Sequence, residues 1–331
     1  MTRPVFRFLV SFHYHQRTDL KEIADSYDGP CEVFADSGAY SAASLGVQID
    51  LKEYAAWLKD WQRLLTVRAT LDVIGDPQAT ARNTAKLESM GLPVLPVFHV
   101  GTPFEKLEEL CQQYDYIALG GMVPHTTNPQ AILRWLVRCF QIARHTGTVF
   151  HGFGQTQINT LKLLPFYSAD SSTWSSGARF GAIVLWDDKR QDFVRLSSGD
   201  ASAAKRYAEL LRSHGADPAL VGRRGFAILS KRTPEQFRVE STMMRGAPAV
   251  AYLRMGDWLA GRHQVPRPAS LGAGANGSTV YLADTVSSHL TEATATMNRV
   301  YDTNSPGTNV YLAETLPVNL KTVATHLGRA V

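Results

Sequence analysis

The chain contains 331 residues, of which 44% are hydrophobic and 19% are charged, and it carries a formal net charge of +4. These values describe an ordinary globular protein that can bury a sizeable core, and the length fits an α/β barrel as one unit. No stretch approaches the roughly 20 apolar residues that a membrane-spanning helix needs, so we expect no contact with a membrane. The small basic excess permits contact with phosphates without requiring it.

Three cysteines, Cys31, Cys111 and Cys139, lie far apart in the sequence. A sparse, odd set without a Cys-x-x-Cys pair predicts a reducing compartment, no disulfide framework and no thiolate-rich zinc site. The apolar run near the N-terminus is too short, and too interrupted by His and Arg, for a signal peptide. We therefore expect a cytoplasmic protein without a metal ion or another cofactor.

The first half of the chain alternates between short apolar runs and amphipathic stretches. Buried strands are predicted at residues 5–14, 31–35, 67–73, 93–100, 116–121 and 148–154, and helices at 51–65, 77–90, 104–113 and 129–145. Asp76 followed by Pro77 marks the start of the second of these helices, because Asp caps a helix and Pro suits its first position. This alternation predicts a parallel sheet with right-handed crossovers.

A doubly wound sheet and a (β/α)8 TIM barrel both fit the alternation. The number of units and the polar residues that follow the predicted strands favour the barrel. These residues are Asp36-Ser37-Gly38, Asp72, His99, Gly120-Gly121, His151-Gly152 and Asp170. In a barrel the carboxyl ends of all strands meet at one mouth, where catalytic groups lie.

The pattern changes after Asp170. Residues 179–196 predict two strands joined by the polar turn 187–190, a β-hairpin inserted after the seventh barrel strand. A helix is predicted at 201–214, and residues 226–229 are expected to form the last barrel strand. The expected organisation is a barrel domain over residues 1–265 followed by a C-terminal extension over 266–331.

The extension contains a weak repeat with a period of thirty residues. Residues 279–285 (TVYLADT) recur as residues 309–315 (NVYLAET), after a glycine-rich segment at 271–277 that predicts a flexible link. Two copies are too few for a solenoid. We therefore expect a structural tail.

Taken in order, these motifs resemble those of the tRNA-guanine transglycosylase family, which includes relatives that modify DNA. The resemblance covers roughly residues 33–211. It is carried by Asp36-Ser37-Gly38-Ala39-Tyr40, Leu71-Asp72, Phe98-His99-Val100-Gly101, Leu119-Gly120-Gly121, His151-Gly152-Phe153-Gly154 and Asp170 with Arg179 and Gly181 behind it. Alanine stands for a family glycine at position 39, and His99 stands where the family has glutamine.

One departure is informative. The tRNA enzymes carry a zinc subdomain with three cysteines and a histidine, whereas residues 232–331 contain no cysteine. The chain is therefore most similar to the zinc-free DNA 7-deazaguanine transglycosylases of phages and bacteria, and a phage-encoded copy would act in the host cytoplasm. The partners that the resemblance implies are DNA with a flipped or unpaired guanine and a free 7-deazaguanine base. A homodimer is left open.

The resemblance also implies roles for individual residues. Asp170 is expected to be the nucleophile that traps C1′, and Asp36 the general acid/base. The expected base-binding residues are Ser37, Tyr40, Asp72, His99, Gly120, Gly121, His151 and Gly152, and Arg179, Lys189 and Arg190 are expected to contact phosphates. Within this set Asp72 reads the guanine edge, His99 and the two glycines donate to O6, and Tyr40 and His151 stack on the ring.

Each of these residues also has a purely structural interpretation. Asp36 and Asp72 can cap turns, and Asp170 can cap a helix. The two histidines and Tyr40 can be core residues, Gly120-Gly121 can be a tight turn, and the three basic residues can be a solvated surface. The functional interpretation rests on their joint occurrence in family order.

The sequence thus predicts a transglycosylase that exchanges guanine in DNA for a 7-deazaguanine base. Three other functions stay open: the same exchange on tRNA, hydrolysis of the glycosidic bond by a barrel hydrolase, and a catalytically silent nucleic-acid-binding module. The silent module would bind with a steep salt dependence and would not depend on Asp170 for any turnover.

Overall fold

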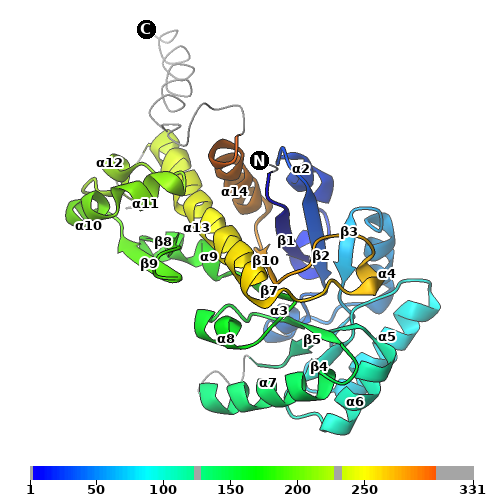
Figure 1. Cartoon of the computed structure of the whole chain (residues 1–331). Coiled ribbons are helices and arrows are strands. Elements are labelled where there is room, and N and C mark those ends of the chain that lie inside the picture. Colours follow the sequence, from blue (N-terminus) through cyan, green and yellow to red (C-terminus); the bar gives the residue numbers. More distant parts are fainter. Residues whose placement is uncertain (1–2, 123–127, 227–232, 303–331) are drawn as a thin grey trace.

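The computed structural model describes residues 3–122, 128–226 and 233–302. Its centre is a curled sheet of eight parallel strands in the order β3-β2-β1-β10-β7-β6-β5-β4 (Figure 1). The strands are β1 (Phe6–Ser11), β2 (Cys31–Asp36), β3 (Leu65–Arg68), β4 (Val97–His99), β5 (Tyr116–Gly120), β6 (Val149–Gly152), β7 (Ser168–Ser171) and β10 (Thr279–Ala283). The protein is therefore a mixed α/β fold whose curled parallel sheet is compatible with a TIM-barrel-like architecture, and the parallel sheet that the alternation predicted is confirmed.

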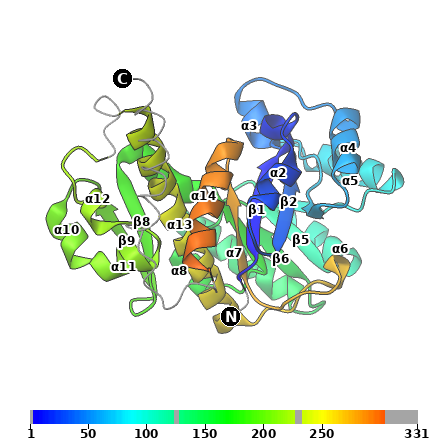
Figure 2. The same ribbon diagram turned by 90° about the horizontal axis from the view of Figure 1, so that it is seen from above.

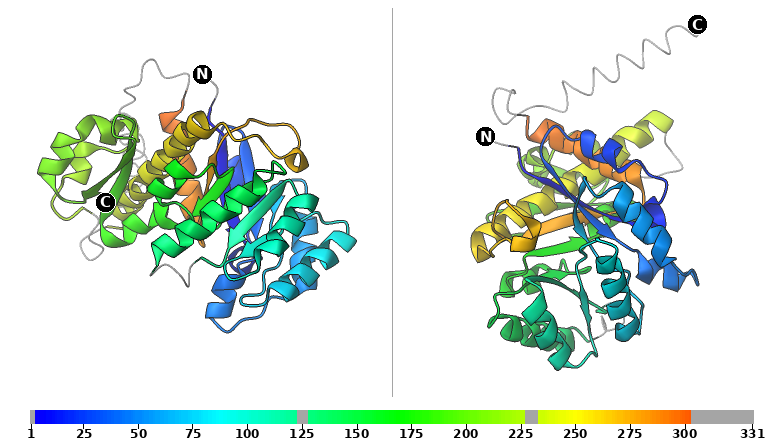
Figure 3. Two further views of the ribbon diagram at one scale, coloured as in Figure 1. Left: turned by 60° about the horizontal axis from the view of Figure 1, so that its bottom comes forward. Right: turned by 90° about the vertical axis from the view of Figure 1, so that its right-hand side faces the viewer.

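Helices follow most strands and lie on the outer side of the curled sheet (Figure 3). They are α1 (Phe12–His15), α2 (Leu20–Asp25), α3 (Ala39–Ser44), α4 (Leu51–Asp60), α5 (Pro77–Ser89), α6 (Phe104–Gln113), α7 (Pro129–Ala143), α8 (Ile158–Leu163), α9 (Thr173–Ser176) and α14 (Ser287–Val300). The predicted start of α5 is confirmed, because the Asp76 side chain accepts from the backbone N–H of Ala79 and Pro77 opens the helix.

The first six predicted strands and the four predicted helices are present, with shorter strands at the two sheet edges. The prediction for 93–100 is too long because Pro93 and Pro96 have no N–H to donate to a ladder, so β4 keeps three residues. Beyond β3 the pairing continues only as a parallel bridge between Ala69 and Leu95. There Leu95 N–H donates to Arg68 O at 2.6 Å and Thr70 N–H donates to Leu95 O at 3.0 Å. This bridge links the two edges of the sheet.

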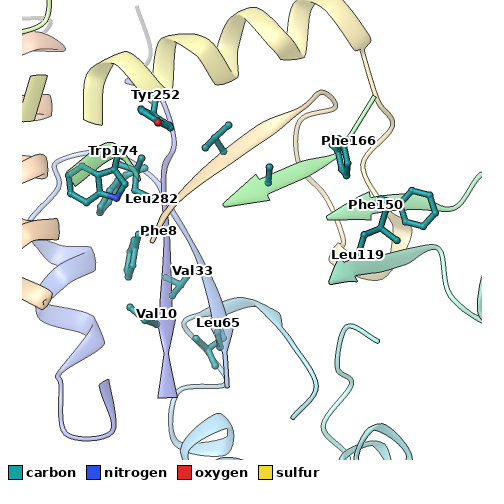
Figure 4. Close-up of a cluster of buried hydrophobic side chains, with 14 of the residues drawn as sticks. Phe8, Val10, Val33, Leu65, Leu119, Phe150, Phe166, Trp174, Tyr252 and Leu282 are labelled. Carbon is teal, nitrogen blue, oxygen red and sulfur yellow. The ribbon is translucent and has the colours of Figure 1, made fainter. Parts of the chain in front are cut away.

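Alternation along the strands divides the buried side chains between two faces. Phe8, Val10 and Val33 point outward and pack against the helices in an outer core, part of which Figure 4 shows. Leu9 and Phe34, which are sequence neighbours of these residues, belong to an inner core on the other face of the curled sheet. Successive strand residues point to opposite faces, so a residue two positions beyond an inner-core residue shares its face. This rule decides which strand-end residues face the mouth.

The predicted boundary between a barrel domain and an extension, at 265/266, is corrected. The first copy of the repeat forms β10, the eighth strand of the sheet. β10 lies between β1 and β7, with Leu9 paired to Ala283 and Asp170 paired to Tyr281. All five residues of β10 are buried, which explains its continuous apolar sequence. The strand expected at 226–229 is not supported: Phe226 lies in a turn, and 227–229 fall outside the described residues. The second repeat copy also falls outside them.

The predicted hairpin is confirmed, and a long helix that was not predicted from the sequence connects it to the sheet. Strands β8 (Ala182–Asp187) and β9 (Asp192–Ser197) pair antiparallel. They pack with α10 (Ala201–Arg206), α11 (Ala208–Ser213) and α12 (Pro218–Val221) around a third core, and the predicted helix at 201–214 is divided at Tyr207. Helix α13 (Pro234–His263) lies between this layer and the sheet (Figure 2).

Helix α13 is buried on both sides, so its apolar residues are spread around its circumference without an amphipathic stripe. The chain then crosses the N-terminal side of the sheet through the short helix η4 (Ala269–Leu271). Arg267 in this segment donates to Glu32 at 2.8 Å and to the Tyr167 hydroxyl at 3.0 Å. The segment that includes the predicted flexible link is therefore anchored to the sheet.

The contact between α13 and α14 gives a direct test of this C-terminal arrangement. A Cβ at Gly246 would overlap Thr296 of α14, whereas a Cβ at Gly261, on the same helix, would meet no atom within 4 Å. We expect Gly246→Ala to lower the free energy of unfolding by about 1–3 kcal/mol. Gly261→Ala should leave it unchanged or raise it by up to about 1 kcal/mol. Urea unfolding measures both, and equal effects of the two substitutions would contradict the packing.

Candidate active site

Three aspartates predicted from the sequence lie at the carboxyl ends of strands in this sheet. Asp36 is the last residue of β2, Asp170 lies in β7, and Asp72 follows β3. Asp36 is two positions beyond the inner-core residue Phe34, so it faces the inside of the curled sheet. Asp170 follows Ala169, an outer-core residue, and therefore also faces inward.

The electrostatics of Asp36 connect the three carboxylates. Burial is the largest cause that raises the pKa of Asp36, to about 7; the negative charges of Asp170 and Asp72 act in the same direction, and the backbone hydrogen bonds of Gly38 and Ser37 oppose it. Gly38 N–H donates to Asp36 Oδ2 at 2.9 Å, and the Ser11 hydroxyl lies 3.4 Å from the same oxygen. The charges of Asp170 and Asp72 therefore both act on Asp36, which can give and take a proton near neutral pH.

Asp170 is held through one of its two oxygens. The backbone N–H of Gly154 donates to Asp170 Oδ1 at 2.9 Å, and His151 Nε2 lies 3.2 Å from the same atom. Among the described residues no other protein group bonds to the side chain of Asp170, so Oδ2 is left for another partner. A carboxylate oriented through one oxygen presents the other as a nucleophile in a fixed direction.

A chain of buried polar groups stands behind Asp170. His151 Nδ1 lies 2.7 Å from the Ser168 hydroxyl, which is bonded in turn to the Tyr116 hydroxyl. With the imidazole proton on Nε2, Tyr116 donates to Ser168, Ser168 donates to His151, and His151 donates to Asp170, so every donor meets one acceptor. Burial raises the pKa of Tyr116, which keeps the first proton of this chain in place.

The stacking role predicted for His151 is corrected by this geometry. Its ring is 0% exposed and packs on Phe34 at a centroid distance of 4.4 Å, with Phe153 at its edge. No ring face is open to a purine. His151 positions Asp170 instead.

Asp72 and His99 are paired with each other. His99 Nε2 lies 2.8 Å from Asp72 Oδ2, and the Thr80 hydroxyl donates to Asp72 Oδ1 at 3.0 Å. The predicted donation from this nitrogen of His99 to a base oxygen is therefore replaced by a contact that orients Asp72. Each Asp72 oxygen still has a second lone pair, so the carboxylate keeps the capacity to accept from a ligand.

The three predicted glycines, Gly120, Gly121 and Gly152, lie where a side chain would crowd neighbouring residues. A Cβ at Gly120 would come within 2.9 Å of Val97, and Gly121 has a φ of +74° beside His99. At Gly152 a Cβ would meet Gln155 and Phe166 at 2.9 Å, so this glycine serves packing. Gly120 and Gly121 therefore let the backbone approach His99 closely.

Ser37 and Tyr40 lie on the turn from Asp36 into α3. Ser37 is fully buried, and its hydroxyl accepts from Ala39 N–H at 3.3 Å, which makes it a turn residue and removes it from the predicted base contacts. Tyr40 is 48% exposed, so part of its side chain is accessible to a ligand. Tyr40 stays a candidate stacking residue.

The three predicted phosphate-binding residues lie at two ends of the hairpin. Arg179, in the short helix η2 (Gly177–Phe180), precedes β8, while Lys189 and Arg190 lie in the turn that Asp187 caps. Six strand residues, about 20 Å, separate the two ends. Near the turn, Trp186 of β8 contacts Trp258 of α13. The neighbouring Gly256 of α13 faces Val280 at the start of β10. Only Arg179 is at the end that follows Asp170.

Several residues of the site were missed from the sequence. Ser168 shares the face of Asp170 two positions away, so strand alternation could have found it. The backbone donor Gly154 and the buried Tyr116 gave no such signal, because their roles depend on the spacing between neighbouring strands.

Comparison of the chain with family models, with curated proteins and with solved structures finds no match. Within the described residues no group of three or more His, Cys, Asp or Glu side chains is placed to hold a metal ion. Across the same residues, every helix is too short or too polar to cross a bilayer. The functional interpretation thus rests on the motifs and on the geometry of the site.

The raised pKa of Asp36 predicts a pH-dependent stability. The folded protein holds this proton more tightly than the unfolded chain, so its stabilising effect is present at low pH and is lost as the pH rises through about 7. Between about pH 5 and about pH 8, the free energy of unfolding of the wild type should fall by about 2–3 kcal/mol relative to Asp36→Asn. Urea unfolding at both pH values measures this, and parallel pH dependences would contradict it.

Proposed function

We propose that the chain is a guanine/7-deazaguanine transglycosylase that acts on DNA, built on a closed (β/α)8 barrel. The Ala69–Leu95 bridge supports closure, because it joins the edges of the sheet in the order that a barrel requires. The observation that carries the function is the set of three interacting aspartates, of which Asp170 is held by His151 and Gly154 through a single oxygen.

Base exchange requires the C1′–N9 bond of a nucleotide to break and form again. In the proposed first step Asp170 Oδ2 forms a bond to C1′ as the C1′–N9 bond breaks, and the guanine leaves with the electron pair. In the second step N9 of the incoming 7-deazaguanine attacks C1′, the ester bond breaks, and the Asp170 carboxylate is restored. Two displacements at one carbon retain its configuration.

Proton balance in this scheme is assigned to Asp36. Its proton passes to the leaving guanine, and the carboxylate so formed accepts the N9 proton of the incoming base. A general acid/base works best with a pKa near the operating pH, and burial places that of Asp36 at about 7. The scheme therefore needs no further reactant.

Recognition of the purine is assigned to Asp72, with Tyr40 as a stacking surface. A carboxylate accepts from the N1–H and 2-amino group of guanine, and a base lacking these donors would leave Asp72 unpaired. His99 and Thr80 fix the direction of Asp72. Exchange on tRNA and hydrolysis by water would use the same carboxylates, but they differ from exchange on DNA in the polymer and in the need for a deazapurine.

The direct test is incubation of DNA containing labelled guanine with candidate 7-deazaguanine bases. We expect loss of label only when a deazapurine is present, and a covalent protein–DNA adduct on the peptide that contains Asp170. Asp170→Asn should abolish the adduct and reduce exchange by about 10⁴-fold or more, while Asp217→Asn, at an exposed helix cap, should do neither. Release of guanine without a deazapurine would indicate a hydrolase, and reaction only with tRNA would change the polymer. Label loss unaltered by Asp170→Asn would contradict the mechanism.

The positioning role of His151 has its own test. His151→Phe removes both ring nitrogens, and a displaced Asp170 should lower the single-turnover rate of adduct formation by about 100-fold. The KM for the free base should change little, because His151 does not contact it. Phe34→Leu, which alters the packing of the same ring without removing a hydrogen bond, serves as the control. Equal rate losses in both variants would show that His151 contributes packing and does not position Asp170.

A further inference from the structure

A hollow of about 590 Å³ lies where the base of the hairpin meets the segment after α12. Arg179 and Phe180 line it on one side, Ser197 and Ser198 lie at the end of β9, and Arg224 closes the other side. These residues come from three separate parts of the chain that the fold brings together.

Two of the lining residues are arginines whose charges are not neutralised. Arg179 and Arg224 are exposed, and neither forms an ion pair in the part of the chain that the structure describes. The adjacent Arg223 differs, since it is paired with Glu240. The nearest carboxylate along the chain, Asp200, accepts from the Ala203 N–H at 2.9 Å and caps α10. The lining of the hollow therefore carries two positive charges and no carboxylate.

Three glycines leave the backbone around the hollow without side chains. Gly181, Gly199 and Gly225 line it with φ values of +59°, +81° and +87°, a conformation that favours glycine. The Ser197 and Ser198 hydroxyls add donors beside the two guanidinium groups. Guanidinium and hydroxyl donors at an open surface without side chains in the way suit a phosphodiester.

Phe180 adds an apolar surface to the same rim. It is 75% exposed, the largest exposed fraction among the large hydrophobic side chains of the described residues. An exposed ring beside an unpaired arginine is the combination on which a nucleobase stacks while its phosphate is held.

The hollow is connected to Asp170 by a short, mostly helical path. Residues Thr173–Ser176 and Gly177–Phe180 form α9 and η2, so Arg179 lies about 12–18 Å from Asp170 along the chain. At about 3.4 Å per nucleotide, a few nucleotides span this distance.

We propose that the hollow formed by Arg179, Arg224 and Phe180 is a subsite for the DNA strand that flanks the exchanged nucleotide. The two arginines hold a phosphodiester and Phe180 stacks on the neighbouring base. The proposal rests on the proposed function for the identity of the polymer, and it assigns to Arg224 and Phe180 a role that the sequence did not suggest.

The test measures binding of a fluorescent single-stranded oligodeoxynucleotide with one guanine, in an Asp170→Asn background that blocks turnover. Arg179→Ala/Arg224→Ala is compared with Lys189→Ala/Arg190→Ala, which removes the same charge at the far end of the hairpin. We expect the first pair to raise Kd about tenfold or more and to reduce the salt slope by about 1, and the second pair to change Kd less than about threefold. Phe180→Ala should raise Kd by about tenfold without changing the salt slope.

Two further measurements keep the outcomes separate. The thermal midpoint of each variant should equal that of its parent, since all four basic residues and Phe180 are exposed. An RNA of the same sequence in a second arm should bind more weakly. Equal effects of the two double variants, or no binding of either polymer, would overturn the subsite. If the Asp170 adduct forms but the two double variants bind equally, the proposed function stands without the subsite. If the subsite variants weaken binding but no adduct forms, the hollow binds nucleic acid and the proposed chemistry is wrong.

Discussion

The candidate site requires three carboxylates to lie close together in a partly buried environment. Desolvation and the repulsion between like charges both oppose their ionised forms. Asp36 shows the cost most clearly, because its pKa is raised to about 7 by burial and by the charges of Asp170 and Asp72. Each carboxylate is restrained by donors from its own surroundings: Gly38 at Asp36, Gly154 and His151 at Asp170, and Thr80 and His99 at Asp72. Structures that tolerate such repulsion commonly use it in chemistry.

The parallel sheet supplies the rigidity that this arrangement needs. β10 pairs with both β1 and β7 and thereby fixes the spacing between the strands that carry Asp36 and Asp170. Helix α13 packs on β10 and on the hairpin. On the N-terminal side of the sheet, Arg267 donates to Glu32 of β2. The C-terminal residues thus belong to the support of the site, although they contribute no aspartate to it.

The parts of this molecule whose signals are local could be predicted from the sequence. The α/β alternation, the cap at Asp76, the hairpin and the aspartates at strand ends all follow from periodicity or from short motifs. Helix α13 could not be predicted in this way, because it is buried on both sides and has no amphipathic stripe. The eighth strand was expected at residues 226–229, because the sequence of β10 resembles a repeat in a tail. His151 and His99 were assigned to the base, since only the spacing between strands shows that they contact Asp170 and Asp72. The separation of Arg179 from Lys189 and Arg190 likewise follows from the length of the hairpin.

The central claim is that Asp36, Asp72 and Asp170 enclose one purine-sized site. A crystal structure of the protein soaked with a free 7-deazaguanine base tests it most directly. The account predicts a base whose 2-amino edge faces Asp72 and whose N9 faces Oδ2 of Asp170, with Asp36 within hydrogen-bonding reach. A base bound elsewhere, or an Asp170 side chain turned toward the surrounding helices, would contradict it.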